Sequence, residues 1–372
     1  MVTISWQQAL AWRMRRHLLE PIGRLSVPAV VSRLCGVQAQ VAWSAELAVR
    51  VRREASRAGE VGRALREGRL LKTWAMRGTL HLFTPEEAGP FLSLMAAGRS
   101  WERPSWQRYF SVTPKQIEAL RRAVRAALED GPLTREELAA AITAGRGLRH
   151  VGEALGSSWG TLLKPLAWHG DLCHGPTRGN RVTFVRPEDA SSRWRGVPDP
   201  DQAAIAAMGA YFRAYGPTTI DAFANWLAGG WFGKRQLRTW FGTLEPRLAE
   251  VDVSGQQAYV LVEDLDELVS TSPTAAVRLL PGFDQYVLGP GTADGHVVPT
   301  SRRRVVSRQS GWISPVVVVG GVVSGTWELD ADHVRVSWFG EAGTPPRKAL
   351  RAEVDRMSSI LGRDLRPVIG AA

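Results

Sequence analysis

The sequence has few cysteines and no long apolar run. Only Cys35 and Cys173 occur in 372 residues, and neither belongs to a C-x-x-C pair, so a disulfide framework is excluded and a reduced compartment is expected. The longest apolar stretch, from Pro315 to Val323, is interrupted by two glycines and is much shorter than the ~20 residues of a membrane-spanning helix. The N-terminal region mixes arginine with apolar residues and shows no signal-peptide pattern. We therefore expect a cytoplasmic protein that neither crosses nor binds a membrane.

The common catalytic signatures are also missing. The chain has no Walker loop, no G-x-G-x-x-G after a strand, no H-E-x-x-H and no G-x-S-x-G. Phosphoryl transfer, dinucleotide redox chemistry and zinc hydrolysis are thereby disfavoured. His169, Cys173 and His174 lie close in sequence, but they lack a fourth ligand and match no standard zinc spacing. We expect no metal and no other cofactor, and interpret these three residues as parts of a paired wing.

Lysine is scarce although the chain is basic. Of 47 basic residues only five are lysines, against 36 acidic residues, and the formal net charge is +11. A basic chain favours a polyanionic partner. Arginine suits such a partner because its planar group pairs bidentately with phosphate and stacks on bases. Charge alone leaves DNA, RNA and no polyanion at all as alternatives, because some proteins are arginine-rich without binding anything.

Three segments repeat one plan: helix, short turn, two further helices, then two short strands, which is the plan of a winged helix. The clearest internal match pairs 127–142 (ALEDGPLTREELAAAI) with 212–227 (FRAYGPTTIDAFANWL). In both, glycine closes one helix and proline cannot continue it. Thr134 and Thr218 are then placed to cap the next helix, and Glu137 completes a capping box with Thr134. Because helical hairpins occur in many folds, this signal is moderate.

Further patterns complete each repeat. In the first, 60–71 predicts the third helix, and 71–78 and 79–85 predict strands paired around Arg77 and Gly78. In the second, the third helix is expected over Ser158 to Trp168, followed by a two-stranded wing in 171–189. In the third, the basic run 233–248 predicts the last helix.

After about Arg278 the pattern changes to strands and turns. Strands are expected in 279–290, 311–330 and 333–340, with Gly320-Gly321 as a tight hairpin turn, and a helix over Pro346 to Leu361. Between them, the polar and basic stretch 290–311 is either a disordered loop or a DNA-probing hairpin.

The fold class predicted is therefore α+β: three tandem winged-helix modules followed by a C-terminal β-rich region with a terminal helix. The expected segments are 1–110, 111–195, 196–275 and 276–372. The last of them would carry the probing hairpin and the terminal helix.

The triplet Gln38-Ala39-Gln40 is the most informative polar motif. Two residues apart on a regular helix, the glutamines would lie about 200° apart and could not serve one site. In an extended segment, period-two geometry would turn both amides one way and Ala39 the other. The preceding Cys35-Gly36 favours such a break, because glycine permits unusual backbone angles. The alternative is that both glutamines bond to neighbouring backbone at a helix start.

Three motifs in this order resemble the AlkZ-like winged-helix DNA glycosylases: the triplet before Trp43, TWAMRGTLHL at 73–82, and LLPGFDQYVLGP at 279–290 with the trailing GGVVSGTW. The resemblance runs from about residue 5 to residue 365. It implies a concave DNA-binding channel and excision of N7-alkylated purines without metal or lyase activity. Glutamine at residue 40 places the chain with the branch that excises bulky natural-product guanine adducts and unhooks interstrand cross-links. The middle residue, Ala39, is smaller than a bulky aliphatic side chain.

The resemblance assigns roles to specific residues. Gln38 and Gln40 are the expected catalytic residues, as positioners of a water and of carbonyl dipoles, since an amide cannot accept a proton at neutral pH. From positions in the first wing and in the basic stretch, the expected DNA contacts are Lys72, Arg77, Thr79, His81, Arg302, Arg303 and Arg304. The resemblance adds a probing hairpin in the basic stretch, with His296 near its tip. The alternatives are a first wing that packs on its own module and an arginine run in a solvated loop. Asp284 and Asp294 are the alternative catalytic acids if the glutamines are not the catalytic residues, although Asp284 is more consistent with a cap or turn at a strand end. Trp43, Trp159, Trp226 and Trp240 are expected in cores.

The predicted function is a monofunctional, monomeric DNA glycosylase that acts on double-stranded DNA carrying alkylated or cross-linked purines, in repair and antibiotic self-resistance. The identity of the adduct stays open. A non-enzymatic winged-helix regulator is the main alternative, although three unlike modules in one chain argue against a symmetric repressor. A protein that shields lesions without cutting is the third.

Overall fold

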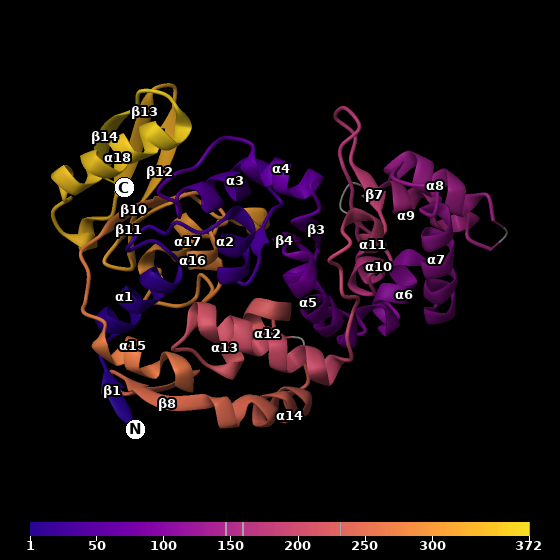
Figure 1. Ribbon diagram of the computed structural model, residues 1–372, viewed down its shortest axis with the longest axis horizontal. Helices are drawn as coiled ribbons and strands as arrows, with labels where there is room; N and C mark the ends of the chain where they lie inside the picture. Colours follow the sequence, from indigo (N-terminus) through magenta and orange to yellow (C-terminus); the bar gives the residue numbers. More distant parts are fainter. Residues whose placement is uncertain (146, 158–159, 231, 372) are drawn as a thin grey trace. The chain divides into compact units, whose positions relative to one another are not determined.

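The structure is a computed structural model, and it describes residues 1–145, 147–157, 160–230 and 232–371 (Figure 1). It is a mixed α+β chain that forms two compact units. The first unit comprises Met1–Glu60, Met208–Trp226 and Lys234–Ala372, and the second comprises Val61–Ala207 and Leu227–Gly233. This division is coarser than the four segments expected from the sequence, whose boundaries stay a prediction.

Among the residues described, none of the helices combines the length and the apolar character that crossing a lipid bilayer requires.

The first unit contains both ends of the chain. Its elements are β1 (Val2–Ile4), α1 (Trp6–Arg16), α2 (Val27–Arg33), β2 (Val37–Gln38), α3 (Ala42–Arg50), α14 (Lys234–Leu244), η4 (Glu245–Arg247), β8 (Leu248–Val253), β9 (Gln256–Leu261), η5 (Val262–Asp264), α15 (Leu265–Ser270), β10 (Val277–Leu280), α16 (Gln285–Leu288), η6 (Thr300–Arg302), α17 (Arg303–Val306), η7 (Gln309–Gly311), β11 (Val316–Val319), β12 (Val322–Asp330), β13 (His333–Trp338), η8 (Gly340–Ala342), α18 (Arg347–Leu361) and β14 (Arg366–Ala371). The division between the units falls within α12 (Pro200–Tyr215) and α13 (Ile220–Ala228).

Two sheets organise the first unit. The five-stranded sheet has the order β10-β11-β12-β13-β14 and is antiparallel except for the parallel pair β13 and β14. The predicted hairpin turn is confirmed, because Gly320 (φ 56°) and Gly321 (φ 91°) join β11 to β12. The predicted terminal helix is α18, which packs on this sheet through Leu350, Val354 and neighbouring apolar residues (Figure 1). The smaller sheet, β1-β8-β9, packs on α1 and has its own core around Trp12.

The second unit is richer in helices. Its elements are α4 (Glu60–Arg66), β3 (Leu71–Trp74), η1 (Met76–Gly78), β4 (Leu80–Phe83), α5 (Pro85–Ala97), η2 (Ser100–Glu102), α6 (Pro104–Phe110), α7 (Pro114–Ala127), β5 (Leu133–Thr134), α8 (Arg135–Thr143), η3 (Arg149–Val151), α9 (Gly152–Gly156), α10 (Lys164–Trp168), β6 (Cys173–His174), β7 (Thr183–Val185) and α11 (Pro187–Ala190). The strands of this unit belong to one sheet, in which they follow the order β4-β3-β6-β7-β5.

The two hairpins predicted in the second unit are both present. Strands β3 and β4 pair antiparallel from Leu71↔Phe83 to Trp74↔Leu80, and the turn between them contains Arg77 at φ 54° and Gly78 at φ 67°. We call this hairpin the first wing (71–83). Strands β6 and β7 pair antiparallel, and an isolated bridge closes their predicted turn. The capping box at the start of α8 is confirmed, since the Thr134 hydroxyl accepts from Glu137 N and the Glu137 carboxylate accepts from Thr134 N.

Several local predictions were wrong. Helix α13 is capped by Thr219, whose hydroxyl accepts from Ala222 N (3.2 Å), because Thr218 forms a β-bridge with Tyr259 instead. The expected helix from Ser158 to Trp168 is reduced to α10, and Ser158 and Trp159 lie outside the described residues. Trp43 is 46% exposed, so it is not a core residue, whereas Trp226 and Trp240 are buried as predicted.

The region after β10 also differs from the prediction. Residues 285–288 form the helical turn α16 because Asp284 caps it, accepting from Tyr286 N (2.8 Å). The capping role foreseen for Asp284 is thus confirmed. Residues 300–306 of the basic stretch are helical in η6 and α17, so this stretch is neither a disordered loop nor a single long hairpin.

A buried ion pair joins Asp284, the N-cap of α16, to Arg52, two residues after the end of α3. The side chains of Arg52 and Asp284 are both fully buried, and two hydrogen bonds of 2.6 and 2.7 Å join the guanidinium to the carboxylate. Arg52 also donates to the Ala48 carbonyl (2.7 Å). Removal of one member of such a pair leaves the other charge buried without a partner, which is strongly destabilising.

We predict that Asp284→Asn lowers the free energy of unfolding by about 3–5 kcal/mol, because the Arg52 guanidinium loses its buried counter-charge. Urea denaturation measures this change. The matched control is Asp330→Asn, which breaks the exposed Arg335–Asp330 pair and should cost less than about 1 kcal/mol. Equal losses in the two variants would contradict this account of the pair.

Candidate active site

The segment that carries Gln38 and Gln40 begins where α2 ends, and the backbone angles of two residues end this helix. Leu34 is the C-terminal cap of α2, and the next two residues take left-handed angles, with φ 59° at Cys35 and 88° at Gly36. The Gly36 N–H closes the helix end by donating to the Val31 carbonyl (3.0 Å). Left-handed residues end a helix because they reverse the direction of the chain. The predicted break before the glutamines is therefore confirmed, and the chain leaves it in the extended strand β2.

A buried tyrosine from a distant part of the sequence holds this helix end. The Tyr215 hydroxyl donates to the Leu34 carbonyl at 2.7 Å, and the Gln285 side-chain oxygen lies 3.3 Å from the same hydroxyl. Burial raises the pKa of Tyr215 well above its ordinary value, so the hydroxyl keeps its proton and stays a donor. One carbonyl at the end of α2, left without an intrahelical partner, is thereby satisfied.

The two glutamines have different surroundings. Gln38 lies in β2 and is only 6% exposed, Ala39 is 2% exposed, and Gln40 is exposed just before α3. Within the described residues, the Gln38 Oε1 atom is buried and has no hydrogen-bond partner. A buried acceptor without a partner costs about 1–3 kcal/mol, so such atoms are rare and are often functional.

The basic stretch of the first unit divides into paired and unpaired arginines. Arg302 makes two 2.7 Å hydrogen bonds to Glu341 and lies over the Phe339 ring. Arg303 and Arg304 are exposed at the start of α17, and within the described residues neither forms an ion pair. The positive charge available to an outside anion therefore comes from Arg303 and Arg304 more than from Arg302.

His296 does not lie at a hairpin tip. Its ring stacks on Trp6 at the start of α1, with ring centres 3.7 Å apart and an interplanar angle of 11°. The short hairpin in this region is 307–313, closed by the bridge Ser307↔Ile313 with Ser310 and Gly311 at its left-handed turn. Trp312 on this hairpin is 46% exposed and meets Phe283 edge-on. The expected position of His296 is therefore corrected.

In the second unit, the first wing brings Lys72, Arg77, Thr79 and His81 into one hairpin, as predicted. Arg77 is exposed at the turn, and the Thr79 hydroxyl donates to the Met76 carbonyl (3.1 Å). His81 is fully buried, and burial lowers its pKa to about 3, so it is a neutral interior residue and the predicted DNA contact at this position is corrected. Lys72 lines a cavity of about 880 Å³ beside His174.

Sequence reasoning missed Lys164, which begins α10. Its side chain lies alongside the turn of the first wing, because a β-carbon at Gly78 would meet the Lys164 Nζ atom at 3.5 Å. Residues 78 and 164 are 86 positions apart, and the lysine stands in a run of apolar residues with no signal of its own. Only the scarcity of lysine could have drawn attention to it.

The reserve candidates have structural partners. Asp284 is engaged by Arg52, and Asp294 lies 3.7 Å from Arg13 and accepts from His296 N (3.0 Å). Cys173 and His174 lie in β6 and form part of the second hairpin, as expected, but His169 caps the C-terminus of α10 and is not part of the wing, so that part of the prediction was wrong. Among the described residues, no group of three or more histidine, cysteine or acidic side chains could hold a metal ion.

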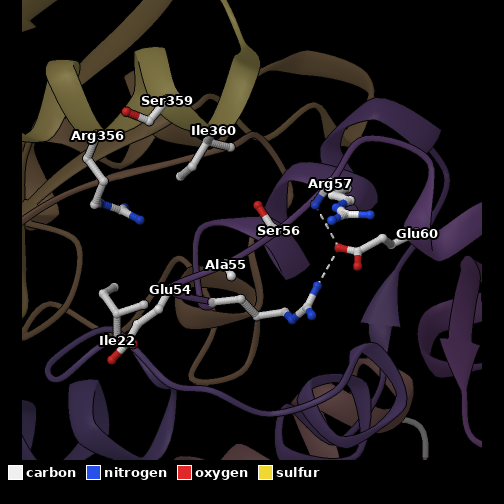
Figure 2. Close-up of a pocket in the computed structure, with 10 residues that line it drawn as sticks. Ile22, Glu54, Ala55, Ser56, Arg57, Glu60, Arg356, Ser359 and Ile360 are labelled. Carbon is white, nitrogen blue, oxygen red and sulfur yellow. Dashed lines mark hydrogen bonds and ion pairs between the residues drawn. The ribbon is translucent and has the colours of Figure 1, made fainter.

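A separate pocket of about 580 Å³ lies in the first unit (Figure 2). Its lining comes from Ile22, from residues 53–60 after α3 and from α18. Glu60 accepts from Arg57 N (2.8 Å) and pairs with Arg53, whereas Arg356 is engaged by Glu353 and the Val51 carbonyl. Arg53 and Glu60 pair within the pocket, and Glu54 and Arg356 pair with Arg24 and Glu353 outside its lining. Because most of its charged side chains are thus engaged, this pocket offers no convergent set for a charged ligand.

Comparison with known proteins agrees over nearly the whole chain. Residues 31–360 match the sequence family described as DNA glycosylase AlkZ-like. A curated protein of Streptomyces sahachiroi, an interstrand DNA cross-link repair glycosylase, is 48% identical over 366 residues, which cover 98% of each chain. The solved structure of the Streptomyces sahachiroi DNA glycosylase AlkZ matches with a TM-score of 0.97 at 47% identity, over 99% of this chain and 100% of that one. On these matches, the chain belongs to the AlkZ-like DNA glycosylase family.

Proposed function

We propose that this chain hydrolyses the N-glycosidic bond of N7-alkylated purines in double-stranded DNA, with Gln38 and Gln40 at its catalytic centre. The observation that carries the proposal is the Gln38 Oε1 atom, which is buried and has no protein partner within the described residues. Such an acceptor is suited to a water molecule or to a positive charge that develops on a bound sugar.

The chemistry fits an amide better than an acid. An N7-alkylated guanine already carries a positive charge, so it departs as a neutral base once the bond between sugar C1′ and base N9 breaks and its electrons move onto the base. A water oxygen then bonds to C1′, and its proton passes to solvent, because an amide cannot accept it at neutral pH. Gln38 and Gln40 would hold that water and direct carbonyl dipoles at the developing charge. No strong general acid is required.

We further propose that the enzyme is monofunctional. A lyase step needs an amine that forms an imine with the sugar aldehyde, and the lysine nearest to the triplet in sequence is Lys72. Hydrolysis would therefore leave an abasic site with the strand uncut.

The substrate class follows from the relatives. One relative is an interstrand DNA cross-link repair glycosylase, so we propose bulky guanine adducts or cross-links as substrates, with roles in DNA repair and in self-resistance to an alkylating antibiotic. A monomer in the cytoplasm would suffice for this activity.

We propose that three winged-helix modules, in 1–110, 111–195 and 196–275, form the DNA-binding channel. Support comes from the repeated order of helices followed by a hairpin: α4 then β3 and β4, α8 to α10 then β6 and β7, and α13 and α14 then β8 and β9. The proposed DNA contacts in the first unit are Arg303 and Arg304, with the hairpin 307–313 in place of His296 as the probing element. In the second unit they are Lys72, Arg77 and Thr79.

We predict that Gln38→Ala and Gln40→Ala each lower the rate of base release from a duplex containing N7-alkylguanine by roughly 10²–10³-fold, while DNA affinity is kept, since a positioned dipole is removed and the binding surface is not. Release of free base under single-turnover conditions measures the rate. Gln257→Ala, at an exposed position in β9, is the matched control and should be unchanged. Wild-type protein that binds the duplex but releases no base would instead favour a regulator or a shielding protein.

We also predict that the double variant Arg303→Glu with Arg304→Glu weakens DNA binding and lowers the slope of log K against log salt by about 0.9 for each phosphate that is no longer neutralised. Arg347→Glu with Arg351→Glu makes the same change in net charge on α18 and serves as the control. If both double variants bind DNA equally well, the arginine run is a solvated surface and the DNA-binding residues lie elsewhere.

A further inference from the structure

Lys164 approaches the first wing from outside the hairpin. It is the first residue of α10, and α10 packs against β3 of that wing. A β-carbon at Gly78 would lie 3.4 Å from Lys164 Cδ and 3.5 Å from Nζ. Gly78 has φ 67°, where glycine is favoured, so the lysine side chain runs along bare backbone at the wing turn.

Lys164 and Lys72 share an unusual electrostatic position. Both side chains are half-buried, and burial lowers the pKa of each without an offset from any nearby carboxylate. Within the described part of the chain, neither ammonium forms an ion pair or a hydrogen bond. By contrast, the partly buried Arg121 in the same unit pairs with the buried Asp171 at 2.7 Å.

The neighbours of these lysines supply no hidden counter-charge. His174, opposite Lys72 in the sheet, is neutral because burial lowers its pKa to about 3. Three carboxylates line the cavity that Lys72 also lines. Asp189 pairs with Arg186, and within the described residues neither Glu129 nor Asp130 pairs with Lys72 or offsets the effect of burial on its pKa. Partial burial disfavours the charged form of a lysine, and an opposite charge nearby would favour it again. A missing counter-ion at a wing, next to the exposed Arg77, points to an anion from outside the protein.

We propose that Lys164 forms a phosphate-binding site at the turn of the first wing, in addition to the contacts already proposed for Lys72 and Arg77, and that this site holds a phosphodiester of the DNA backbone. The inference rests on the proposed function, in that the ligand is the duplex on which the enzyme acts. A backbone phosphate fits because it carries one negative charge, presents two acceptor oxygens and needs no sequence-specific contact. The site would position the duplex and would take no part in bond cleavage.

The experiment uses Lys164→Met and gives two readouts of opposite sign. The melting temperature should rise by about 2–4 °C, because an unpaired, partly desolvated charge is replaced by an apolar chain of similar length. Affinity for a fluorescein-labelled DNA duplex, measured by anisotropy over a potassium chloride series, should fall roughly tenfold, and the salt slope should fall by about 0.9.

Two further variants control the test. Lys164→Arg keeps the charge and should keep most of the salt slope, and Lys115→Met removes an exposed lysine of α7 and should change neither readout. A lower melting temperature in Lys164→Met, or unchanged affinity and slope, overturns the inference. If wild-type protein still releases base in that case, the proposed function stands without this site, whereas wild-type protein that fails to bind the duplex overturns both.

Discussion

The geometry of the candidate active site depends on where helix α2 ends. Two left-handed residues, Cys35 and Gly36, end α2 and send the chain into the extended segment that carries Gln38. The hydrogen bond from Tyr215 to the Leu34 carbonyl holds that end, and it joins residues 181 positions apart. If α2 continued as a helix, Gln38 and Gln40 would lie on opposite faces and could not act on one water. The proposed chemistry therefore requires a local break in regular structure, held by a distant buried side chain.

Among the described residues, some buried polar side chains are paired with one another and others have no hydrogen-bond partner. In the interior, Arg52 and Asp284 pair with each other through two hydrogen bonds. By contrast, the buried Gln38 Oε1 atom has no hydrogen-bond partner within the described residues, and the half-buried Lys72 and Lys164 form no ion pair there. The first of these would meet water or a cationic sugar, and the other two an anionic phosphate. These three groups are thus complementary to the two kinds of charge that a damaged duplex presents.

The sequence predicted best those features that depend on short-range rules. The first wing followed from two strand patterns around Arg77 and Gly78, and the capping box from Thr134 and Glu137, because each depends on a few neighbouring residues. Long-range pairings left no such signal. The bond from Tyr215 to Leu34 and the approach of Lys164 to Gly78 are set by packing between distant segments. The cap of α13 is Thr219 and not the predicted Thr218, because Thr218 forms a β-bridge with the distant Tyr259.

The central claim is that amide groups suffice because the substrate base is already primed to leave. It is tested most directly by single-turnover base release from duplexes that differ at one position, which holds N7-methylguanine, unmodified guanine or uracil. The account predicts release of the cationic N7-methylguanine and no measurable release of the two neutral bases, since a glutamine can neither protonate the leaving base nor deprotonate the water. Release of guanine or uracil at a comparable rate would contradict it and would require a general acid or base in the site.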